Sequence, residues 1–310
     1  MNSLLYLGID GGATKTSAVA LDPDKRVVAE GTGKPSNFQI IGIEQASINI
    51  LETLESLLAD LNVEFSQIKS MCLALAGSGR KDDAERMRLG FISILEKRKY
   101  TAPEVRVESD AVAALEGAFG GKPGMILIGG TGSILMAKDD RGNMHRVGGW
   151  GRFVGDEGSG YTLGRSCLAA VAKEFDGRGR HTMMTQLLKA GTGIEDSESL
   201  IRDVYQRHFD IASAAPFVIE AAEKGDEVAR IIIMENIDEL AAHVSAIVNK
   251  LNKWLPLVLV GGILSSDNFF SVAFRKKMGV EFPYVEIRRT EFSPAMGAAL
   301  LAYESGSVKK

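Results

Sequence analysis

The sequence has few cysteines and no excess of positive charge. Its 310 residues contain only two cysteines, Cys72 and Cys167, which lie far apart within apolar stretches. A disulfide framework and a cysteine-held cluster are therefore disfavoured, and we expect two buried, reduced thiols. The formal net charge is −4. No overall field attracts the chain to nucleic acid or to acidic membranes, so neither is an expected partner.

Long apolar runs and metal-binding histidine patterns are also missing. No apolar run approaches the ~20 residues that span a bilayer, and no basic segment precedes an apolar leader. A cytoplasmic location is the resulting expectation. The four histidines show no ligand spacing to one another, so we expect them at the surface or in capping positions. They are His145, His181, His208 and His243.

The first informative stretch is LLYLGIDGGATKTSAVAL, residues 4–21. An apolar run delivers Asp10 to a strand end, and Gly11 and Gly12 allow a tight turn. The residues that follow are rich in Thr and Val, which predicts a second strand and excludes a Walker loop, after which a helix would begin. A carboxylate beside exposed backbone N–H groups can hold hydrated Mg²⁺ and nucleotide phosphates. An ordinary hairpin turn is the alternative interpretation.

The pattern that follows this hairpin occurs twice. Three antiparallel strands are followed by alternating helices and strands, and a second glycine turn at 129–133 opens the second copy. We therefore predict two βββαβαβα domains, 1–120 and 121–310, with a ligand cleft between them. The second domain carries a helical insertion at about 176–225. The final helix, after Ser293 and Pro294, belongs to it in sequence but can pack on the first domain.

Six motifs in this order make the chain similar to a known family. It resembles the BadF/BadG/BcrA/BcrD ATPase family, including its N-acetylglucosamine kinases, within the superfamily of sugar kinases, heat-shock ATPases and actin. This resemblance covers nearly the whole chain and implies a duplicated ribonuclease H-like, or actin-like ATPase, fold. The motifs are DGGATKT, SNFQIIG, AGSGR, SDAVAA, GGTGS and GGWGRFVGDEGSGY, of which the last is the most specific.

The resemblance implies two phosphate turns and a nucleoside site for ATP with Mg²⁺. Asp10 is expected to hold the Mg²⁺ through water. Lys15 either adds positive charge to the phosphates or is a solvated lysine, since neighbouring side chains on a strand alternate faces. The residues expected at the phosphates are Gly11, Gly12 and Thr14 on one side and Gly130, Thr131 and Gly132 on the other, while Gly261 and Gly262 resemble the adenosine motif.

Asp110 is the predicted catalytic base. It ends a buried strand and begins a helix, and kinases of this superfamily place the base at the matching position. The alternative role is a helix N-cap, which Asp performs well. The two roles are compatible if Ser109 supplies the cap.

The acceptor site is expected around the GGWGRFVGDEGSGY motif. Carboxylates and amides suit sugar hydroxyls, and an aromatic ring supplies a wall. Ile134 departs from mammalian N-acetylglucosamine kinases, which carry Asn there, and the role of Glu157 is left open. By resemblance, the acceptor is contacted by Asn37, Asp110, Ser133, Gly149, Trp150, Gly151 and Asp156.

The resulting hypothesis is an ATP-dependent kinase that phosphorylates the 6-hydroxyl of an amino sugar, with N-acetylglucosamine as first choice. Glucosamine and N-acetylmuramate are the alternative acceptors, and Arg152 is either a contact for a lactyl carboxylate or a surface residue. An ATPase activator of a reductase or dehydratase is the competing function. Its cluster ligands have no counterpart here, because no cysteine lies near the glycine turns. Family members are often dimers, and the sequence leaves a homodimer open.

Overall fold

The computed structural model contains the whole chain, and the structure describes residues 4–307. The chain forms two compact units, each with its own five-stranded sheet. The first unit comprises Met1–Pro123 and Arg289–Lys310, and the second comprises Gly124–Arg288. Within residues 4–307, no helix combines the length and apolarity needed to cross a membrane.

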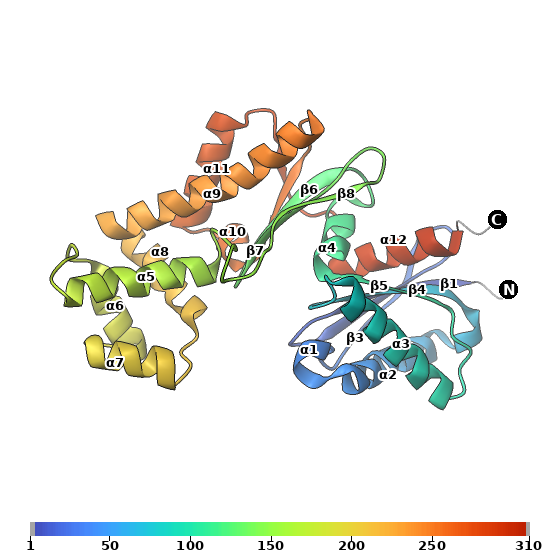
Figure 1. Cartoon of the computed structure of the whole chain (residues 1–310). Helices are drawn as coiled ribbons and strands as arrows, with labels where there is room; N and C mark the ends of the chain where they lie inside the picture. Colours follow the sequence, from blue (N-terminus) through green and yellow to red (C-terminus); the bar gives the residue numbers. More distant parts are fainter. Residues whose placement is uncertain (1–3, 308–310) are drawn as a thin grey trace. The chain divides into compact units, whose positions relative to one another are not determined.

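The first sheet has the strand order β3-β2-β1-β4-β5 (Figure 1). Strand β2 pairs antiparallel with β1 and β3, whereas β4 lies parallel to both β1 and β5. The expected meander is therefore followed by two parallel strands. The strands are β1 (Leu5–Gly11), β2 (Thr16–Leu21), β3 (Val27–Gly33), β4 (Ile68–Leu75) and β5 (Glu104–Ser109).

Helices cover both faces of this sheet. Helices α2 and α3 pack together on one face, and α4 and α12 pack together on the other (Figure 1). The buried side of α2 carries apolar residues at helical spacing, from Ile50 to Leu58, as the sequence predicts. The helices are α1 (Phe38–Ile41), α2 (Ile43–Leu61), the 3-10 turn η1 (Phe65–Gln67), α3 (Lys81–Lys97), α4 (Asp110–Phe119) and α12 (Pro294–Ser307).

The final helix, α12, lies directly on the backbone of the first sheet. A Cβ atom on Gly8 of β1 would lie 2.0 Å from the backbone nitrogen of Ala299, and one on Gly297 would lie 2.0 Å from the carbonyl oxygen of Ala113. The buried hydroxyl of Ser70 donates to the carbonyl of Ala302 at 2.6 Å. The small residues of this helix permit this close packing, and α12 is part of the first unit.

The second sheet repeats the same arrangement, with the order β10-β9-β6-β7-β8. Strands β6, β7 and β8 form the antiparallel meander, and β9 lies parallel to β6 and β10. This repetition, with helices beside each sheet, confirms the expected duplicated α/β fold. The strands are β6 (Gly124–Gly129), β7 (Ser133–Lys138), β8 (Met144–Gly148), β9 (Leu257–Val260) and β10 (Ile287–Arg288).

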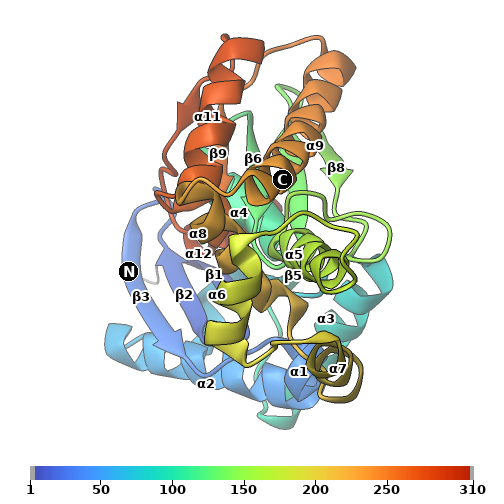
Figure 2. The same cartoon turned by 90° about the vertical axis from the view of Figure 1, so that its left-hand side faces the viewer.

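The longest helix of the second unit, α9, packs beside α5, α8 and α11 (Figure 2). Its buried side, from Ala229 to Val248, contributes to one large apolar core. The helices are α5 (Gly160–Phe175), α6 (Met183–Thr192), α7 (Ser197–Ile201), the π-helical turn η2 (Arg202–Gln206), the 3-10 turn η3 (Ile211–Ala214), α8 (Ala215–Glu223), α9 (Glu227–Leu251), α10 (Gly262–Ser265) and α11 (Phe269–Glu281).

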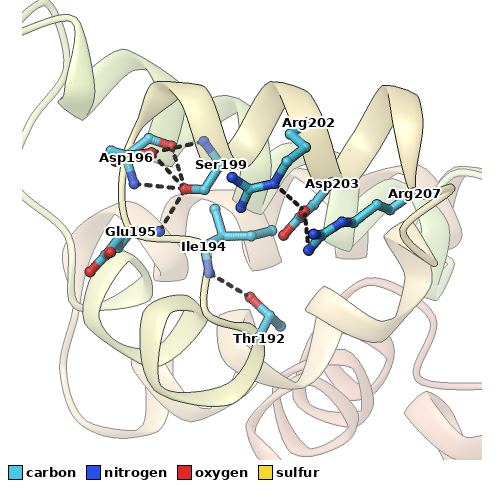
Figure 3. A network of polar contacts seen from close by, with 8 residues as sticks. All are labelled: Thr192, Ile194, Glu195, Asp196, Ser199, Arg202, Asp203 and Arg207. Atoms are coloured by element: carbon cyan, nitrogen blue, oxygen red, sulfur yellow. Dashed lines mark hydrogen bonds and ion pairs between the residues drawn. The ribbon is translucent and has the colours of Figure 1, made fainter.

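Short-range polar contacts stabilise the segment from the end of α6 to η2, which lies within the expected helical insertion (Figure 3). Asp196 caps α7 by accepting the N–H of Ser199 at 2.8 Å. Asp203 is largely buried and lies 3.1 Å from Arg202 and 3.2 Å from Arg207. Two guanidinium groups thus compensate a carboxylate that would be costly to bury alone.

Strand β10 is short, with only two residues. The N–H of Val285, two residues before it, donates to the carbonyl of Phe282 at 2.9 Å, in the turn after α11. Strand pairing therefore begins only after that turn is complete.

The contact between Gly8 and α12 gives a stability prediction. Gly8→Ala should lower the free energy of unfolding by about 2 kcal/mol or more, because the added methyl group meets backbone atoms that cannot rotate away. Urea unfolding checks this. The matched control is Gly279→Ala in α11, where a Cβ has no neighbour within 4 Å. It should be neutral or stabilising by up to about 1 kcal/mol, and equal effects of the two changes would contradict the packing argument.

Candidate active site

The first glycine turn is a hairpin between β1 and β2, as the sequence predicts. The N–H of Gly12 donates to the carbonyl of Lys15 at 3.0 Å and closes the turn. A Cβ on Gly11 would lie 2.2 Å from the hydroxyl oxygen of Ser36 and 2.4 Å from Leu75, so close packing requires glycine here. Ala13, Thr14 and Lys15 at the tip are exposed, which leaves the tip open to a ligand.

Asp10 is a partly buried carboxylate with a perturbed acidity. Burial, and then the negative charge of Asp110, raise the pKa of Asp10 from its ordinary value of 3.8 to about 6, while Lys15 acts in the opposite direction. Asp110 and Lys15 are therefore both close enough to Asp10 to act on its carboxylate. A nearby cation would stabilise the ionised form of this carboxylate.

Ser109 caps helix α4, and Asp110 is left with a carboxylate that the cap does not need. Ser109 is the N-cap of α4, and its hydroxyl accepts the N–H of Val112 at 3.3 Å. Asp110 is the first helical residue, and its side chain is exposed. One carboxylate oxygen accepts the N–H of Ala111 at 2.8 Å. The cap does not depend on Asp110, so its exposed carboxylate is accessible to a ligand.

The strand register brings these groups to one edge of the first sheet. Gly11 stands opposite Leu75, and Leu75 stands opposite Ser109, across three parallel strands. The turn after β4 is fixed there by Ser78, whose hydroxyl lies 2.7 Å from the carbonyl of Leu75 and 2.5 Å from that of Glu108. Asp10 and Asp110 thus leave neighbouring parts of the same sheet edge.

Asn37 lies in a loop tied to the first glycine turn. The N–H groups of Ser36 and Asn37 both donate to the carbonyl of Gly12, each at 3.1 Å. The Asn37 side-chain oxygen caps α1 by accepting the N–H of Gln39 at 3.0 Å. Within residues 4–307 its Nδ2 group has no protein partner, so it can donate to a ligand.

The second glycine turn, after β6, is open at its tip and joined to α5 at its base. Gly130 and Thr131 accept the N–H groups of Gly160 and Tyr161, at 2.8 and 3.2 Å. Thr131 is exposed. A Cβ on Gly261 would lie 2.4 Å from the carbonyl oxygen of Gly129, so the expected adenosine motif lies directly beside this turn.

A cavity of about 640 Å³ lies next to these glycines. Gly130, Thr131 and Gly262 line it, as expected for a nucleotide site, but Gly261 does not. Sequence reasoning did not assign its other walls, which come from the start of α5, η3, α8, α10 and the turn before α11. Gly160 lies in the GGWGRFVGDEGSGY motif, and the residues of η3 and α8 lie in no motif, because their apolar residues have the ordinary spacing of core helices. The missed lining residues are Gly160, Ala212, Ala215, Pro216, Ile219, Glu220, Glu223, Ile263, Ser266 and Asn268.

Asp156 joins the second glycine turn to the acceptor loop, a name we use for residues 148–158. Asp156 is buried and has a left-handed backbone, with φ of 60°. One carboxylate oxygen accepts the N–H of Gly151 at 3.2 Å, and the other would lie 2.9 Å from a Cβ on Gly132. The hydroxyl of Ser133 donates to the carbonyl of Glu157 at 2.6 Å. The structure therefore brings Asp156, Gly132, Ser133 and Gly151 together.

Trp150 and Gly149 lie in the same loop. Trp150 is 68% exposed, which excludes a core role for its ring, and the guanidinium of Arg146 lies 4.7 Å from the ring centre. Gly149 has φ of 68°, and a Cβ there would lie 2.7 Å from Ile134. Ile134 thus supports the loop by packing.

The expected site residues form one group in each unit. Asp10, the first glycine turn, Asn37 and Asp110 belong to the first unit, and the second glycine turn, the acceptor loop and Gly261–Gly262 belong to the second. Sequence reasoning also missed two residues of α9, Asn236 and His243, which contact the acceptor loop. Their only signal is a helical spacing that any buried face would show.

The chain is similar to characterised and structurally solved sugar kinases. The N-acetyl-D-glucosamine kinase of Dictyostelium discoideum is 33% identical to it, over 98% of this chain and 99% of that protein. The N-acetylmuramic acid/N-acetylglucosamine kinase of Clostridium acetobutylicum is 32% identical, over 96% and 97%. A solved structure of a candidate N-acetylglucosamine kinase from Chromobacterium violaceum superposes with a TM-score of 0.74 at 26% identity, over 97% and 100% of the two chains.

A family model agrees with these similarities and with the resemblance inferred from the six motifs. The model of the BadF/BadG/BcrA/BcrD ATPase family matches residues 7–302, which include both glycine turns, Asp110 and the acceptor loop. The chain belongs to the BadF/BadG/BcrA/BcrD ATPase family.

Proposed function

We propose that this protein is an ATP-dependent kinase that transfers the γ-phosphoryl group to the 6-hydroxyl of an amino sugar, with N-acetylglucosamine as the first candidate. The observation that carries the proposal is the exposed carboxylate of Asp110, held beside Asp10 at one sheet edge and not needed as a helix cap. The similarity to two named amino-sugar kinases over nearly their whole length supports the choice of acceptor.

Asp110 is the proposed catalytic base. Phosphoryl transfer to a hydroxyl requires a carboxylate that orients the hydroxyl and takes its proton as the oxygen attacks. Asp110 is exposed, and its attachment to the first turn of α4 fixes its position. Its side chain can therefore meet the acceptor without disturbing the strand behind it.

Asp10 is the proposed holder of Mg²⁺. Its raised pKa shows that a positive charge nearby would stabilise the ionised form, so the residue fits a divalent cation. Within residues 4–307, no group of three or more His, Cys, Asp or Glu side chains forms a metal cage. This suits Mg²⁺, which commonly binds one or two carboxylates and completes its shell with phosphate oxygens and water. Bound Mg²⁺ would neutralise charge on the β- and γ-phosphates.

The two glycine turns are the proposed phosphate contacts. Backbone N–H groups and the hydroxyls of Thr14 and Thr131 can donate to phosphate oxygens, and Lys15 adds charge near Asp10. The cavity bounded by Gly130, Thr131 and Gly262 is the proposed nucleoside site. Its volume and largely apolar walls suit a nucleoside.

The acceptor loop is the proposed sugar site. Asp156, Ser133, and the backbone of Gly149 and Gly151 offer acceptors and donors to ring hydroxyls, and the exposed ring of Trp150 offers a face. Asn37 is a further proposed sugar contact, on the first unit, because its Nδ2 group has no partner among the described residues. The carboxylate of Asp156 contacts both Gly151 of the acceptor loop and Gly132 of the second glycine turn, so Asp156 is the central residue of the proposed sugar site.

Arg152 favours N-acetylmuramate as a second candidate acceptor. Its guanidinium lies 5.1 Å from the ring of Phe153 and 5.6 Å from that of Tyr161, and it has no carboxylate partner within residues 4–307. An unpaired arginine in the acceptor loop can receive the carboxylate of a lactyl ether. The ATPase activator is disfavoured, because Cys72 and Cys167 are buried in separate units and burial raises the pKa of each thiol to about 12.

The acceptor can be identified by ADP release with Mg-ATP and a panel of sugars. We expect a sugar-dependent rate that is highest with N-acetylglucosamine or N-acetylmuramate and at least about tenfold lower with glucose, because a site built for a substituent loses contacts when the substituent is absent. A coupled assay measures it. A slow rate that is the same with every sugar, or with none, would remove the proposal.

Asp110→Asn should reduce kcat by about 100-fold or more, since proton acceptance by a positioned carboxylate contributes at least that much. Asn keeps the acceptor oxygen for the N–H of Ala111, and Ser109 keeps the cap, so the fold should be retained. Steady-state kinetics and circular dichroism check both parts. The control is Asp60→Asn on the exposed side of α2, which should leave kcat unchanged. Near-normal turnover of Asp110→Asn would refute the assignment.

Asp10→Asn should abolish most activity and yet stabilise the magnesium-free protein at neutral pH. The folded carboxyl keeps its proton up to a pH of about 6, whereas the unfolded chain releases it near 3.8. The ionised form therefore costs stability above pH 6, and this cost disappears as the pH falls toward 4. Urea unfolding should show the variant more stable by on the order of 1–3 kcal/mol at pH 7.5, with a smaller difference at pH 5. A difference independent of pH would contradict the argument.

A further inference from the structure

Helix α9 supports the acceptor loop through three side chains on one face, Asn236, Leu240 and His243. At the end of the loop, the N–H of Gly158 donates to Asn236 at 3.0 Å, and a Cβ on Gly158 would lie 2.4 Å from Leu240. At its start, a Cβ on Gly148 would lie 2.3 Å from Nε2 of His243. Both ends of the loop therefore lie against the same helix.

His243 is buried, and its ring has a defined orientation. Its Nδ1 atom lies 2.7 Å from the carbonyl oxygen of Glu239, one turn earlier in α9. A carbonyl oxygen only accepts hydrogen bonds, so Nδ1 carries a proton and donates it. Nε2 then faces the acceptor loop, 3.9 Å from a carboxylate oxygen of Glu157, a separation that forms an ion pair when Nε2 carries a proton as well. In this charged form the ring gives Glu157 a partner outside the loop.

Glu157 lies between residues proposed to bind the sugar. Its carbonyl accepts the hydroxyl of Ser133, and it directly follows Asp156. Asp156 has a left-handed backbone, which is unfavourable for a residue with a Cβ and needs support from its surroundings. A change in the position of Glu157 would therefore move Asp156 and Ser133 as well.

We propose that His243 is a positioning residue of the acceptor site. It holds Glu157 and Gly148 in place and thereby keeps the carboxylate of Asp156 between Gly132 and Gly151. The inference rests on the proposed function, because that function assigns the loop to the sugar. His243 touches no reacting group, so its removal should weaken binding of the sugar and leave binding of ATP unchanged.

Two substitutions separate the role of Nδ1 from the role of Nε2. In His243→Asn, the amide can still donate to the carbonyl of Glu239, but nothing remains at the position of Nε2. In His243→Gln, the longer side chain can place its amide near Glu157. We expect His243→Asn to raise KM for the sugar by roughly tenfold, with KM for ATP unchanged, and His243→Gln to restore much of the loss.

Initial-rate kinetics in both substrates measure these effects. The matched control is His181→Asn, which removes an exposed histidine that contacts Glu174 outside the acceptor loop. Neither KM should change in the control. An equal rise in both KM values of His243→Asn, or a fall in kcat alone, would overturn the proposal, because general loosening of the second unit gives those results.

A double-mutant cycle with Glu157→Gln tests the path of the effect. If His243 acts through Glu157, the sugar KM of the double variant should lie within about twofold of the higher of the two single-variant KM values. Effects that multiply would show independent action and would contradict the proposed path.

Hydrogen exchange separates failure of this inference from failure of the proposed function. It is measured on the substrate-free protein, so it does not depend on which sugar is used. Residues 148–158 should exchange faster in His243→Asn than in the unsubstituted protein, with recovery in His243→Gln. Unchanged exchange would overturn the positioning role, whereas an absence of sugar-dependent ADP release would overturn only the function.

Discussion

The parallel register of β1, β4 and β5 is the constraint on which the proposed chemistry depends. It sets Gly11, Leu75 and Ser109 side by side, so that Asp10 and Asp110 leave the sheet at one edge. A shift of one residue would turn every side chain of a strand to the opposite face. Packing prevents that shift: Leu7 and Ile9 fill the core on one face, and Gly8 admits the backbone of α12 on the other. Contacts far from the first glycine turn thus decide where the carboxylate of Asp10 lies.

The duplication is not symmetric at the two turns. Asp10 precedes Gly11 and Gly12 in the first, and the apolar Ile128 precedes Gly129 and Gly130 in the second. Both occupy matching positions in their hairpins, opposite Ser17 and Ile134. A carboxylate repels phosphate unless it holds a cation. If the proposed phosphate contacts are right, the first turn needs a cation beside Asp10, whereas the second turn, with no carboxylate at this position, offers phosphate only N–H and hydroxyl groups.

Local chemistry made the fold and the two glycine hairpins predictable, because the relevant signals lie within a few residues. The Thr- and Val-rich segment after Gly12 identified a hairpin, and Ser109 beside Asp110 allowed both a cap and a free carboxylate. The walls of the cavity could not be predicted in this way. Pro216 and Asn268 come to one place only because α8 and α11 pack together. His243 shows the same limit: its partners Gly148 and Glu157 lie about ninety residues earlier, and its helical spacing to Leu240 indicates a buried face without identifying them.

The acceptor loop illustrates how a flexible sequence becomes an ordered site. Five of its eleven residues, Gly148, Gly149, Gly151, Asp156 and Gly158, have positive φ. Such a segment loses much conformational entropy on folding, and glycine adds to that loss. The cost is offset by partners outside the loop: Ile134 against Gly149, α9 at both ends, and Ser133 at Glu157. Because folding has already fixed the backbone, a sugar that binds there need not order it again. The side chains of Trp150, Phe153 and Val154 are exposed. If the loop binds the sugar as proposed, its fixed backbone supplies the polar contacts, and these exposed side chains can adjust around the sugar.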